Sequence, residues 1–175
     1  MSATITFKAK EIIMTNELTL SRRGLLIGAV QAAAAFGLWH PATAETLPRM
    51  IVTRDPNCGC CGNWVEHVKS AGFPVEVVEV ADVAPVKLKL GVPDALASCH
   101  TAEVGGYVLE GHVPADAIKR LLAEKPQVTG LAVAGMPLGS PGMEVPGQAP
   151  DTYDVVVFSA GRENVFARYR GLQQL

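Results

Sequence analysis

The chain has 175 residues, of which 49% are hydrophobic and 18% charged, and its formal net charge is −2 at pH 7. That balance argues against a protein that binds nucleic acid or an anionic membrane through a basic face, so we expect neither partner. The four cysteines direct attention to thiol chemistry instead.

The N-terminal segment has the features of an export signal. Ser21-Arg22-Arg23-Gly24-Leu25-Leu26 is close to the twin-arginine pattern, and an apolar run broken only by Gln31 continues to Trp39. That run is shorter than the ~18 apolar residues that a membrane-spanning helix needs. Small residues at 42–44 suit a signal peptidase. We therefore predict a signal peptide over residues 1–44, a periplasmic location and no membrane span after cleavage.

Residues 45–175 then form the mature chain, which has the size of one ordinary domain. Of the 15 basic and 17 acidic residues, four and two lie in the signal segment, which leaves 11 and 15 and a net charge of −4. All four cysteines remain, and in an exported protein the default expectation is two disulfides. The twin-arginine route weakens that default slightly, because it carries proteins that fold, and can be loaded with a cofactor, before export.

The mature chain begins with alternating strands and helices. Apolar residues recur at helical or strand spacing, and Gly and Pro end the runs. The predicted elements are a strand at 49–55, an amphipathic helix from the cysteine cluster to Gly72, a strand at 73–80, a short helix at 84–93, a strand at 105–114 and a helix at 115–126.

A long Gly- and Pro-rich segment, residues 128–151, follows and is expected to be an ordered functional loop. Strands at 153–159 and 164–169 then form a C-terminal hairpin. The order of elements predicts an α/β fold with a βαβ-based sheet, helices on its faces and this hairpin. A C-x-x-C pair at the first strand-to-helix junction is the thioredoxin-like arrangement.

Three of the four cysteines lie at the expected start of the first helix. Cys58 and Cys61 form the C-x-x-C pair, and Cys60 is a third thiol that a redox pair does not need. A helix N-terminus favours thiolate, which both attacks disulfides and binds metals. Position alone therefore leaves a redox site and a metal site open.

Three features favour a metal. Adjacent Cys60 and Cys61 suit bridging between soft ions, and Cys99 precedes the strand predicted at 105–114. Met136 and Met143 lie in the late loop, and thiolate and thioether are the donors that suit Cu(I). A methionine is more often a packing residue, but these two lie in a loop and not on an apolar helix face.

The histidines are weaker candidates. His100, beside Cys99, is the best histidine ligand, and His112 is a poorer one. His67 is expected to be a solvated helix residue, and Trp64 to belong to the core or to lie over the helix start. No paired carboxylates, catalytic triad or phosphate-binding loop are found.

The chain from about residue 50 to 171 resembles the CopG-type copper-resistance family, a group formerly described as a domain of unknown function. The matching residues are Cys58-Gly59-Cys60-Cys61, Trp64, Ser98-Cys99-His100-Thr101, Gly105, Tyr107, Glu110-Gly111-His112-Val113-Pro114, Met136-Pro137 and Gly139-Ser140-Pro141-Gly142-Met143. The resemblance implies a periplasmic, thioredoxin-like domain that binds copper through clustered cysteines, in storage, transfer or redox handling of the metal.

Together these observations predict a periplasmic copper-binding protein of copper homeostasis or resistance, not an ordinary enzyme. Its partners would be copper ions and other periplasmic copper-handling proteins. The predicted ligands are Cys58, Cys60, Cys61 and Cys99, with Met136, Met143 and His100 as further candidates. Two alternatives stay open: a thiol–disulfide oxidoreductase that uses Cys58 and Cys61 with Cys99 as resolving thiol, and a structural zinc site of Cys58, Cys61, Cys99 and His100.

Overall fold

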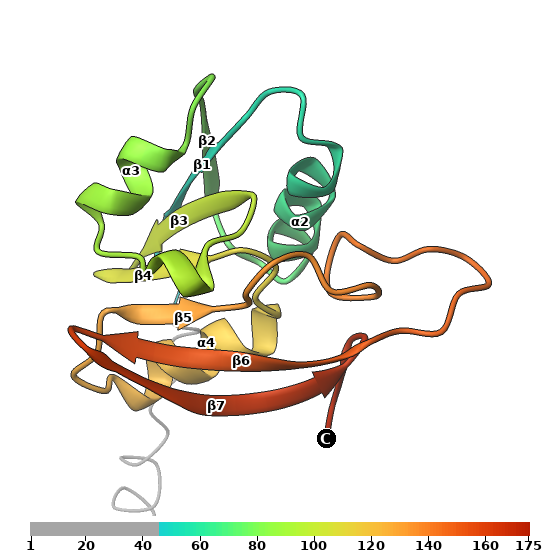
Figure 1. The fold of residues 1–175 in the computed structure, drawn as a ribbon. Coiled ribbons are helices and arrows are strands. Elements are labelled where there is room, and N and C mark those ends of the chain that lie inside the picture. Colours follow the sequence, from blue (N-terminus) through green and yellow to red (C-terminus); the bar gives the residue numbers. More distant parts are fainter. Residues whose placement is uncertain (1–45) are drawn as a thin grey trace, which may run out of the picture. The chain divides into compact units, whose positions relative to one another are not determined.

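Eight strands form one mixed sheet in the computed structural model, which describes residues 46–175 (Figure 1). The predicted signal peptide lies outside the described residues. No helix in the described part has the length and apolar character needed to cross a bilayer. The elements are β1 (Met50–Arg54), α2 (Gly59–Ser70), β2 (Val75–Glu79), α3 (Ala84–Lys89), the 3-10 turn η1 (Asp94–Leu96), β3 (His100–Val104), β4 (Tyr107–Glu110), α4 (Ala115–Glu124), β5 (Gly130–Ala132), β6 (Thr152–Ser159), β7 (Arg162–Arg170) and β8 (Gln173–Gln174).

The strands lie in the order β2-β1-β3-β4-β5-β6-β7-β8. β1 runs parallel to β2 and β4 runs parallel to β5, while the other neighbours are antiparallel. Parallel neighbours need a crossover connection, and α2 and α4 supply the two crossovers. The α/β fold class, with helices on the faces of a βαβ-based sheet and a C-terminal hairpin, is confirmed.

The main core lies on the face of the sheet that α2 and α4 cover. Alternate residues of one strand point to opposite faces, so Leu109 and Leu131 enter the main core while Val108 and Ala132 belong to a smaller cluster. The helix residues of the main core include Trp64, Val65, Val68, Ile118 and Leu121. The smaller cluster packs under the segment between α3 and β3, through Val92 and Leu96.

Three short strands depart from the predicted elements. β4 lies within the strand predicted at 105–114, whereas β3 precedes it and was not predicted; Gly105 and Gly106, at φ of 57° and 86°, join the two strands into a hairpin. β5 lies in the stretch expected as loop, and β8 follows the predicted hairpin. β3, β5 and β8 have five, three and two residues, too few for a periodic pattern to stand out.

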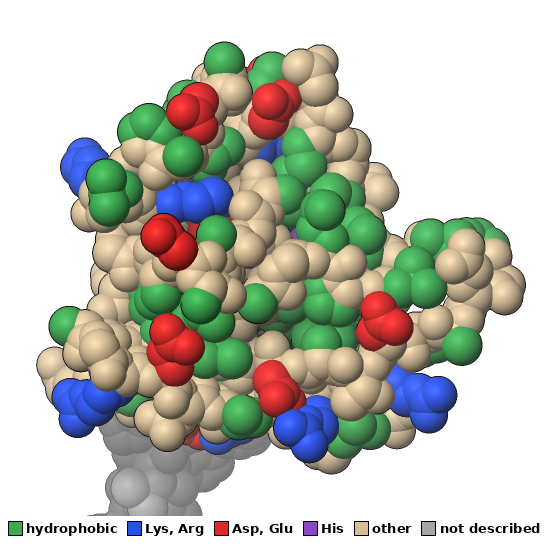
Figure 2. Space-filling model, viewed as in Figure 1, with side chains coloured by type: hydrophobic (Ala, Val, Ile, Leu, Met, Phe, Trp, Pro, Cys, Tyr) green, Lys and Arg blue, Asp and Glu red, His purple; other side chains and the backbone are tan. Residues whose placement is uncertain are grey.

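The surface carries charges of both signs. On the face shown in Figure 2, the acidic and basic side chains are interspersed and do not form a continuous basic area. This distribution agrees with the small net charge of the chain.

Candidate metal centre

Helix α2 begins inside the cysteine cluster. Cys58 is its N-cap residue, with no side-chain capping hydrogen bond, and the first turn contains no acidic residue. The free N–H groups of a helix start and the helix dipole therefore face the sulfur atoms and favour negative charge there. Arg54 adds a guanidinium, whose Nη1 donates to the Cys58 carbonyl at 3.1 Å and whose Nη2 pairs with Glu79 at 2.7 Å.

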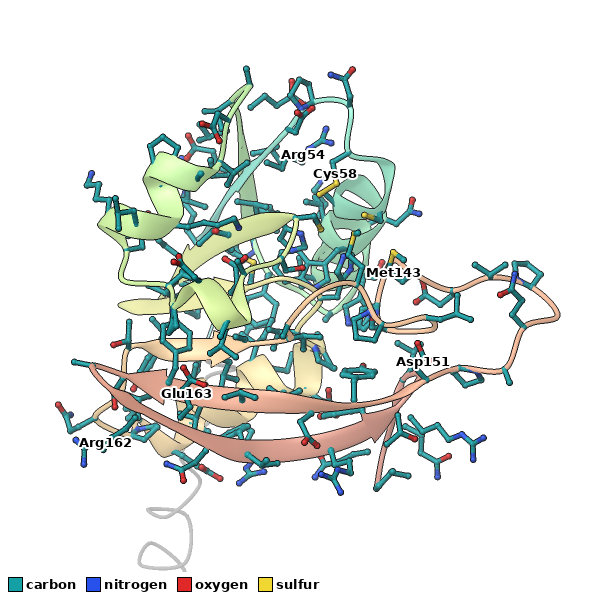
Figure 3. The ribbon with its side chains drawn as sticks, in the orientation of Figure 1. Arg54, Cys58, Met143, Asp151, Arg162 and Glu163 are labelled. Atoms are coloured by element: carbon teal, nitrogen blue, oxygen red, sulfur yellow. A yellow bond between two sulfur atoms is a disulfide. The ribbon has the colours of Figure 1, made fainter. Side chains whose placement is uncertain are left out.

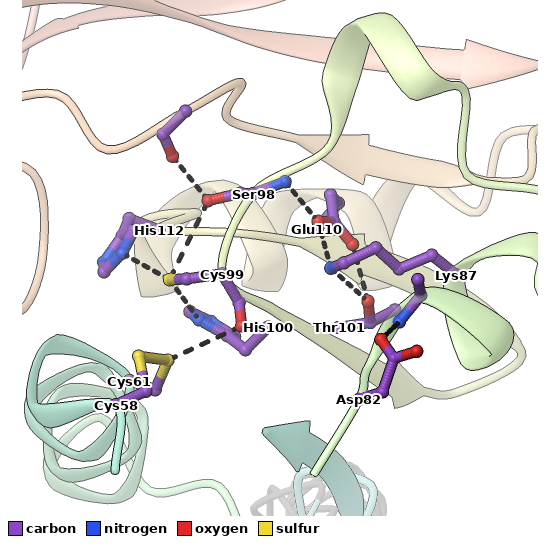
Figure 4. A network of polar contacts seen from close by, with 12 residues as sticks. Cys58, Cys61, Asp82, Lys87, Ser98, Cys99, His100, Thr101, Glu110 and His112 are labelled. Atoms are coloured by element: carbon purple, nitrogen blue, oxygen red, sulfur yellow. Dashed lines mark hydrogen bonds and ion pairs between the residues drawn. A yellow bond between two sulfur atoms is a disulfide. The ribbon is translucent and has the colours of Figure 1, made fainter. Parts of the chain in front are cut away.

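Four sulfur atoms meet at this helix start, and Figure 4 shows those of Cys58, Cys61 and Cys99. Cys58 and Cys61 form a disulfide, while Cys60 and Cys99 are free thiols. The Cys60 Sγ lies 3.5 Å from the Cys58 Sγ and 3.8 Å from the Cys99 Sγ. All four sulfurs lie within 4.8 Å of one another, so they could together hold a metal once the disulfide is reduced. The fold therefore brings Cys99 to the helix start.

Cys99 also belongs to a second group of potential ligands. It precedes β3, and its Sγ lies 3.3 Å from His100 Nδ1 and 3.1 Å from His112 Nε2 (Figure 4). These three ligand atoms lie within 4.8 Å of one another. Cys99 thus joins a four-sulfur group to a group of one sulfur and two imidazoles, and a metal cluster could extend over both.

The backbone around Gly111 brings His112 to Cys99. Gly111 has φ of 69°, and a Cβ there would lie 2.5 Å from the Val133 carbonyl oxygen, so the turn after β4 requires glycine. His112 Nδ1 lies 2.8 Å from the Pro141 carbonyl oxygen. Because a carbonyl only accepts, Nδ1 carries the proton and Nε2 presents its lone pair to Cys99.

His100 is completely buried behind the sulfur cluster. Its ring lies 4.4 Å from the Trp64 ring, and its Nε2 has no hydrogen-bond partner among the described residues. Burial lowers the pKa of His100 well below its ordinary value, and it also lowers the pKa of His112. Both rings are therefore neutral at neutral pH and have a lone pair for a proton or a metal.

The Cys99 thiol is held in its protonated form. Burial, together with the nearby Cys60, raises its pKa to about 12. A thiol at 3.1 Å from an imidazole nitrogen that accepts can donate its proton there. A metal that binds Cys99 has to displace this proton, because thiolate is the ligating form.

The late loop returns to the start of α2. A Cβ on Gly142 would lie 2.7 Å from the Trp64 nitrogen and 2.8 Å from the Cys60 carbonyl oxygen, and Asn63 Nδ2 donates to the Gly142 carbonyl at 3.4 Å. Met143, the next residue, is half-buried and is labelled in Figure 3. Met136 is 55% exposed, so of the two predicted methionine ligands it is the less enclosed.

Comparisons with known proteins agree with this geometry. A family described as "Protein of unknown function, DUF411" matches residues 96–143, the range that holds Cys99, both buried histidines and the late loop. Among curated proteins, none matches the chain. A solved structure titled "Copper resistance protein copG- Form 1" is 44% identical, with 71% of this chain and 99% of that chain covered and a TM-score of 0.66. The structure titled Form 2 has the same identity and TM-score, with 70% and 98% covered.

The chain belongs to the CopG family of copper resistance proteins. The alignment covers 99% of the solved relative at 44% identity, so the described part of this chain shares the fold of that relative. The predicted resemblance to this family is confirmed. The CopG-family chain also carries the sulfur group and the Cys99–His100–His112 group in the positions described above.

Sequence reasoning located some site residues and missed others. His112 was ranked below His100 as a ligand, yet its Nε2 lies nearer to the Cys99 sulfur, at 3.1 Å against 3.3 Å for His100 Nδ1. The sequence feature that could have indicated it is the Gly111-His112 pair directly after an apolar strand. His67 is not a solvated residue: it is half-buried, and its Nε2 accepts the Ala115 backbone N–H at 3.2 Å. Trp64 is a core residue as predicted, and its Nε1 donates to the Val113 carbonyl at 2.9 Å.

Proposed function

We propose that this CopG-family protein binds copper as Cu(I) in copper homeostasis or resistance. Cys58, Cys60, Cys61 and Cys99 are its thiolate ligands, and some of them bridge more than one ion. The observation that carries this proposal is the convergence of four sulfur atoms within 4.8 Å. Soft thiolates select Cu(I), and the solved relatives are titled copper resistance proteins.

Full use of the sulfur group requires reduction of the Cys58–Cys61 disulfide. Two electrons and two protons from a thiol reductant convert this bond into two thiols, and Cu(I) then displaces thiol protons. The oxidised form, with only Cys60 and Cys99 free, would bind fewer ions. The copper capacity of the protein should therefore follow its thiol state.

Neutral donors around the cysteines complete the proposed site. His100 and His112 present ring nitrogens to Cys99, and Met143 and Met136 supply thioethers from the late loop. Imidazole and thioether are neutral ligands, so they add no negative charge to the site. The thiolates already carry more negative charge than a few Cu(I) ions neutralise. We propose His112 as a ligand in addition to the set predicted from the sequence.

A thiol–disulfide oxidoreductase is the second candidate. The disulfide between Cys58 and Cys61 at the start of α2 favours it, because that position activates a thiol for exchange. A structural zinc site of Cys58, Cys61, Cys99 and His100 is a third. The position of Cys60 between Cys58 and Cys99 distinguishes copper bridging from both, because neither alternative uses Cys60.

Cys60→Ser is therefore the deciding variant. Reduced, metal-free protein would be titrated with Cu(I) against a chromophoric chelator under anaerobic conditions, and insulin reduction would be measured in parallel. We expect fewer Cu(I) ions per Cys60→Ser molecule and weak reductase activity in both proteins. Unchanged copper binding together with strong reductase activity in Cys60→Ser would instead establish the oxidoreductase. Preferential zinc retention in both proteins would favour the structural site.

We further propose that residues 1–44 direct export by the twin-arginine route and that residues 45–175 act as a thioredoxin-like copper-binding domain in the periplasm, alongside other copper-handling proteins. Replacement of Arg22 and Arg23 by Lys should leave precursor in the cytoplasm, as cell fractionation would show. Normal maturation of that variant would indicate the general secretory route. Loading of copper before export would then no longer be supported.

A further inference from the structure

A buried carboxylate lies behind Cys99, and the proposed copper site does not use it as a ligand. Glu110, the last residue of β4, is completely buried. Its Oε1 accepts the Ser98 backbone N–H at 2.6 Å and a hydrogen bond from Lys87 Nζ at 2.5 Å, and its Oε2 accepts the Thr101 hydroxyl at 2.6 Å (Figure 4).

This arrangement compensates a buried charge. An ionised carboxylate in the interior is costly unless it is paired and hydrogen-bonded, and Glu110 has three donors, of which one, Lys87, is a cation. Lys87 comes from α3, a helix without a fully buried residue, and its side chain is only 13% exposed. The ion pair therefore links α3 to the end of β4, next to the site.

The donors of Glu110 lie on both sides of Cys99. Ser98 precedes the cysteine and Thr101 follows it by two positions, and Thr101 is the register partner of Glu110 across β3 and β4. The His100 carbonyl accepts the Gly111 N–H at 3.0 Å. One carboxylate thus fixes both ends of a four-residue stretch whose second residue is Cys99.

We propose that Glu110 is the positioning residue of Cys99. By holding Ser98 and Thr101, it keeps the Cys99 sulfur at 3.1 Å from His112 Nε2 and 3.8 Å from Cys60, where one thiolate can serve both ligand groups. Glu110 acts through Cys99 and touches no metal. The consequence for copper rests on the proposed function, whereas the consequence for the thiol does not.

Two variants with a matched control test this role. Glu110→Leu removes the acceptor, and Thr101→Val removes one donor while keeping the shape of the side chain. Thr53→Val is the control, because Thr53 is the register partner of Thr101 on β1 and makes no hydrogen bond with Glu110 in the described part. Partners of metal ligands typically contribute 10–100-fold to metal affinity, so we expect Cu(I) affinity to fall by about 10–100-fold in Glu110→Leu, less in Thr101→Val and not in Thr53→Val.

A double-mutant cycle with Cys99→Ser separates positioning from general damage. If Glu110 acts through Cys99, Glu110→Leu and Thr101→Val should lower Cu(I) affinity no further once Cys99 is Ser. Glu110→Gln keeps an acceptor for the Ser98 N–H and should recover most of the affinity. Equal losses in both backgrounds would overturn the proposal, because they would mean that the whole site is disturbed.

Alkylation of the reduced, copper-free protein gives a readout that does not depend on copper. Mass spectrometry after a brief iodoacetamide pulse should show a several-fold rise in modification at Cys99 in Glu110→Leu and Thr101→Val, with Cys60 unchanged. Thr101→Val serves if Glu110→Leu does not fold, as judged by circular dichroism. Unchanged Cys99 modification in folded variants overturns the positioning role. A protein that shows the rise but binds no copper would refute the proposed function alone.

Discussion

The cysteine end and the β6–β7 hairpin belong to one sheet but bury different chemistry. We define the cysteine end as the start of α2 with residues 98–113 and 139–143. Apart from Thr53 on β1, every buried polar or charged side chain in the described part lies there, namely His100, Thr101, Glu110, His112 and Ser140. The buried residues of the hairpin are Tyr153, Val155, Phe158, Ala167 and Tyr169.

Ion pairs show the same contrast. Lys87 and Glu110 form a pair whose carboxylate is 0% exposed, whereas Arg168 and Asp154 of the hairpin form one with side chains 57% and 31% exposed. Removing one partner of a buried ion pair leaves an uncompensated charge and lowers stability strongly, whereas an exposed pair contributes little to stability. Single substitutions in the buried pair of the cysteine end should therefore be more harmful than single substitutions in the exposed pair of the hairpin.

The difference teaches that the polar groups that position ligand atoms are concentrated at the cysteine end, whereas the apolar core extends through both regions. The hairpin and its apolar partners contribute burial, which stabilises the fold in proportion to area. The cysteine end contains polar groups that stabilise little on balance but fix the positions of donor atoms. Substitutions in the two regions should consequently affect different measurements.

The largest effect is expected for Cys99→Ser. Cys99 belongs to both ligand groups, so its loss removes the bridge between them. A directly ligating sulfur should contribute more than the outer partners of a ligand, so we expect Cu(I) affinity to fall by more than about 100-fold. Chelator competition would measure this, and thermal unfolding of the metal-free protein should change little. An affinity within tenfold of wild type, ~1.4 kcal/mol, would mean that Cys99 is not a ligand.

Val155→Ala should give the opposite pattern. Val155 is completely buried in the main core, and its truncation removes two methyl groups and leaves a cavity. We expect the free energy of unfolding to fall by about 2–3 kcal/mol, as measured by urea denaturation. Cu(I) affinity should stay at the wild-type value. A matching loss of copper affinity would show that the two regions are not energetically separate.

The hairpin was the more predictable region. Its two strands follow from apolar and β-branched runs around Gly161, and they lie at β6 and β7 close to the predicted bounds. The bulge between Val155 and Val156 was not predicted, because an extra residue in one strand is set by the pairing and not by local composition. Local signals sufficed where burial is apolar.

The cysteine end was predictable only in part. The clustering of the cysteines and the position of His100 beside Cys99 pointed to these five residues, and the fold brings them together. Glu110 was named among the residues that match the family, but its buried ion pair was not predicted, although a carboxylate in the largely apolar run from Tyr107 to Val113 requires a buried partner. That partner, Lys87, is 23 positions away, and the turn that brings His112 to Cys99 depends on contacts of Gly111 with Val133 and Ser98. Such contacts between distant segments have no periodic signature in the sequence.

Met143→Leu should have a smaller effect on the cysteine end. Leu and Met have similar volumes, so the stability cost should be under ~1.5 kcal/mol, but Leu offers no sulfur. We expect Cu(I) affinity to fall several-fold and zinc affinity to stay the same, because zinc prefers N and thiolate donors to thioether. Met136→Leu is the matched control with a more exposed sulfur and should lose less. Wild-type copper affinity in the double variant would make both methionines ordinary packing residues.

Asp154→Asn should have the smallest effect, and it should be confined to stability. The hydrogen bonds from Arg168 hold the pKa of the Asp154 carboxyl below its ordinary value of 3.8. The folded protein therefore binds this proton less readily than the unfolded chain, so the ion pair contributes stability above about pH 4 and loses it as the pH falls through the lowered pKa. Because the pair is exposed, the contribution should be small and should shrink further in ~1 M salt. Urea denaturation of both proteins should show a small difference at pH 7 that disappears at strongly acidic pH, with Cu(I) affinity at pH 7 unchanged. A difference that grows towards acidic pH would contradict the assigned direction of the pKa shift, and a change in copper affinity would contradict the separation of the hairpin from the cysteine end.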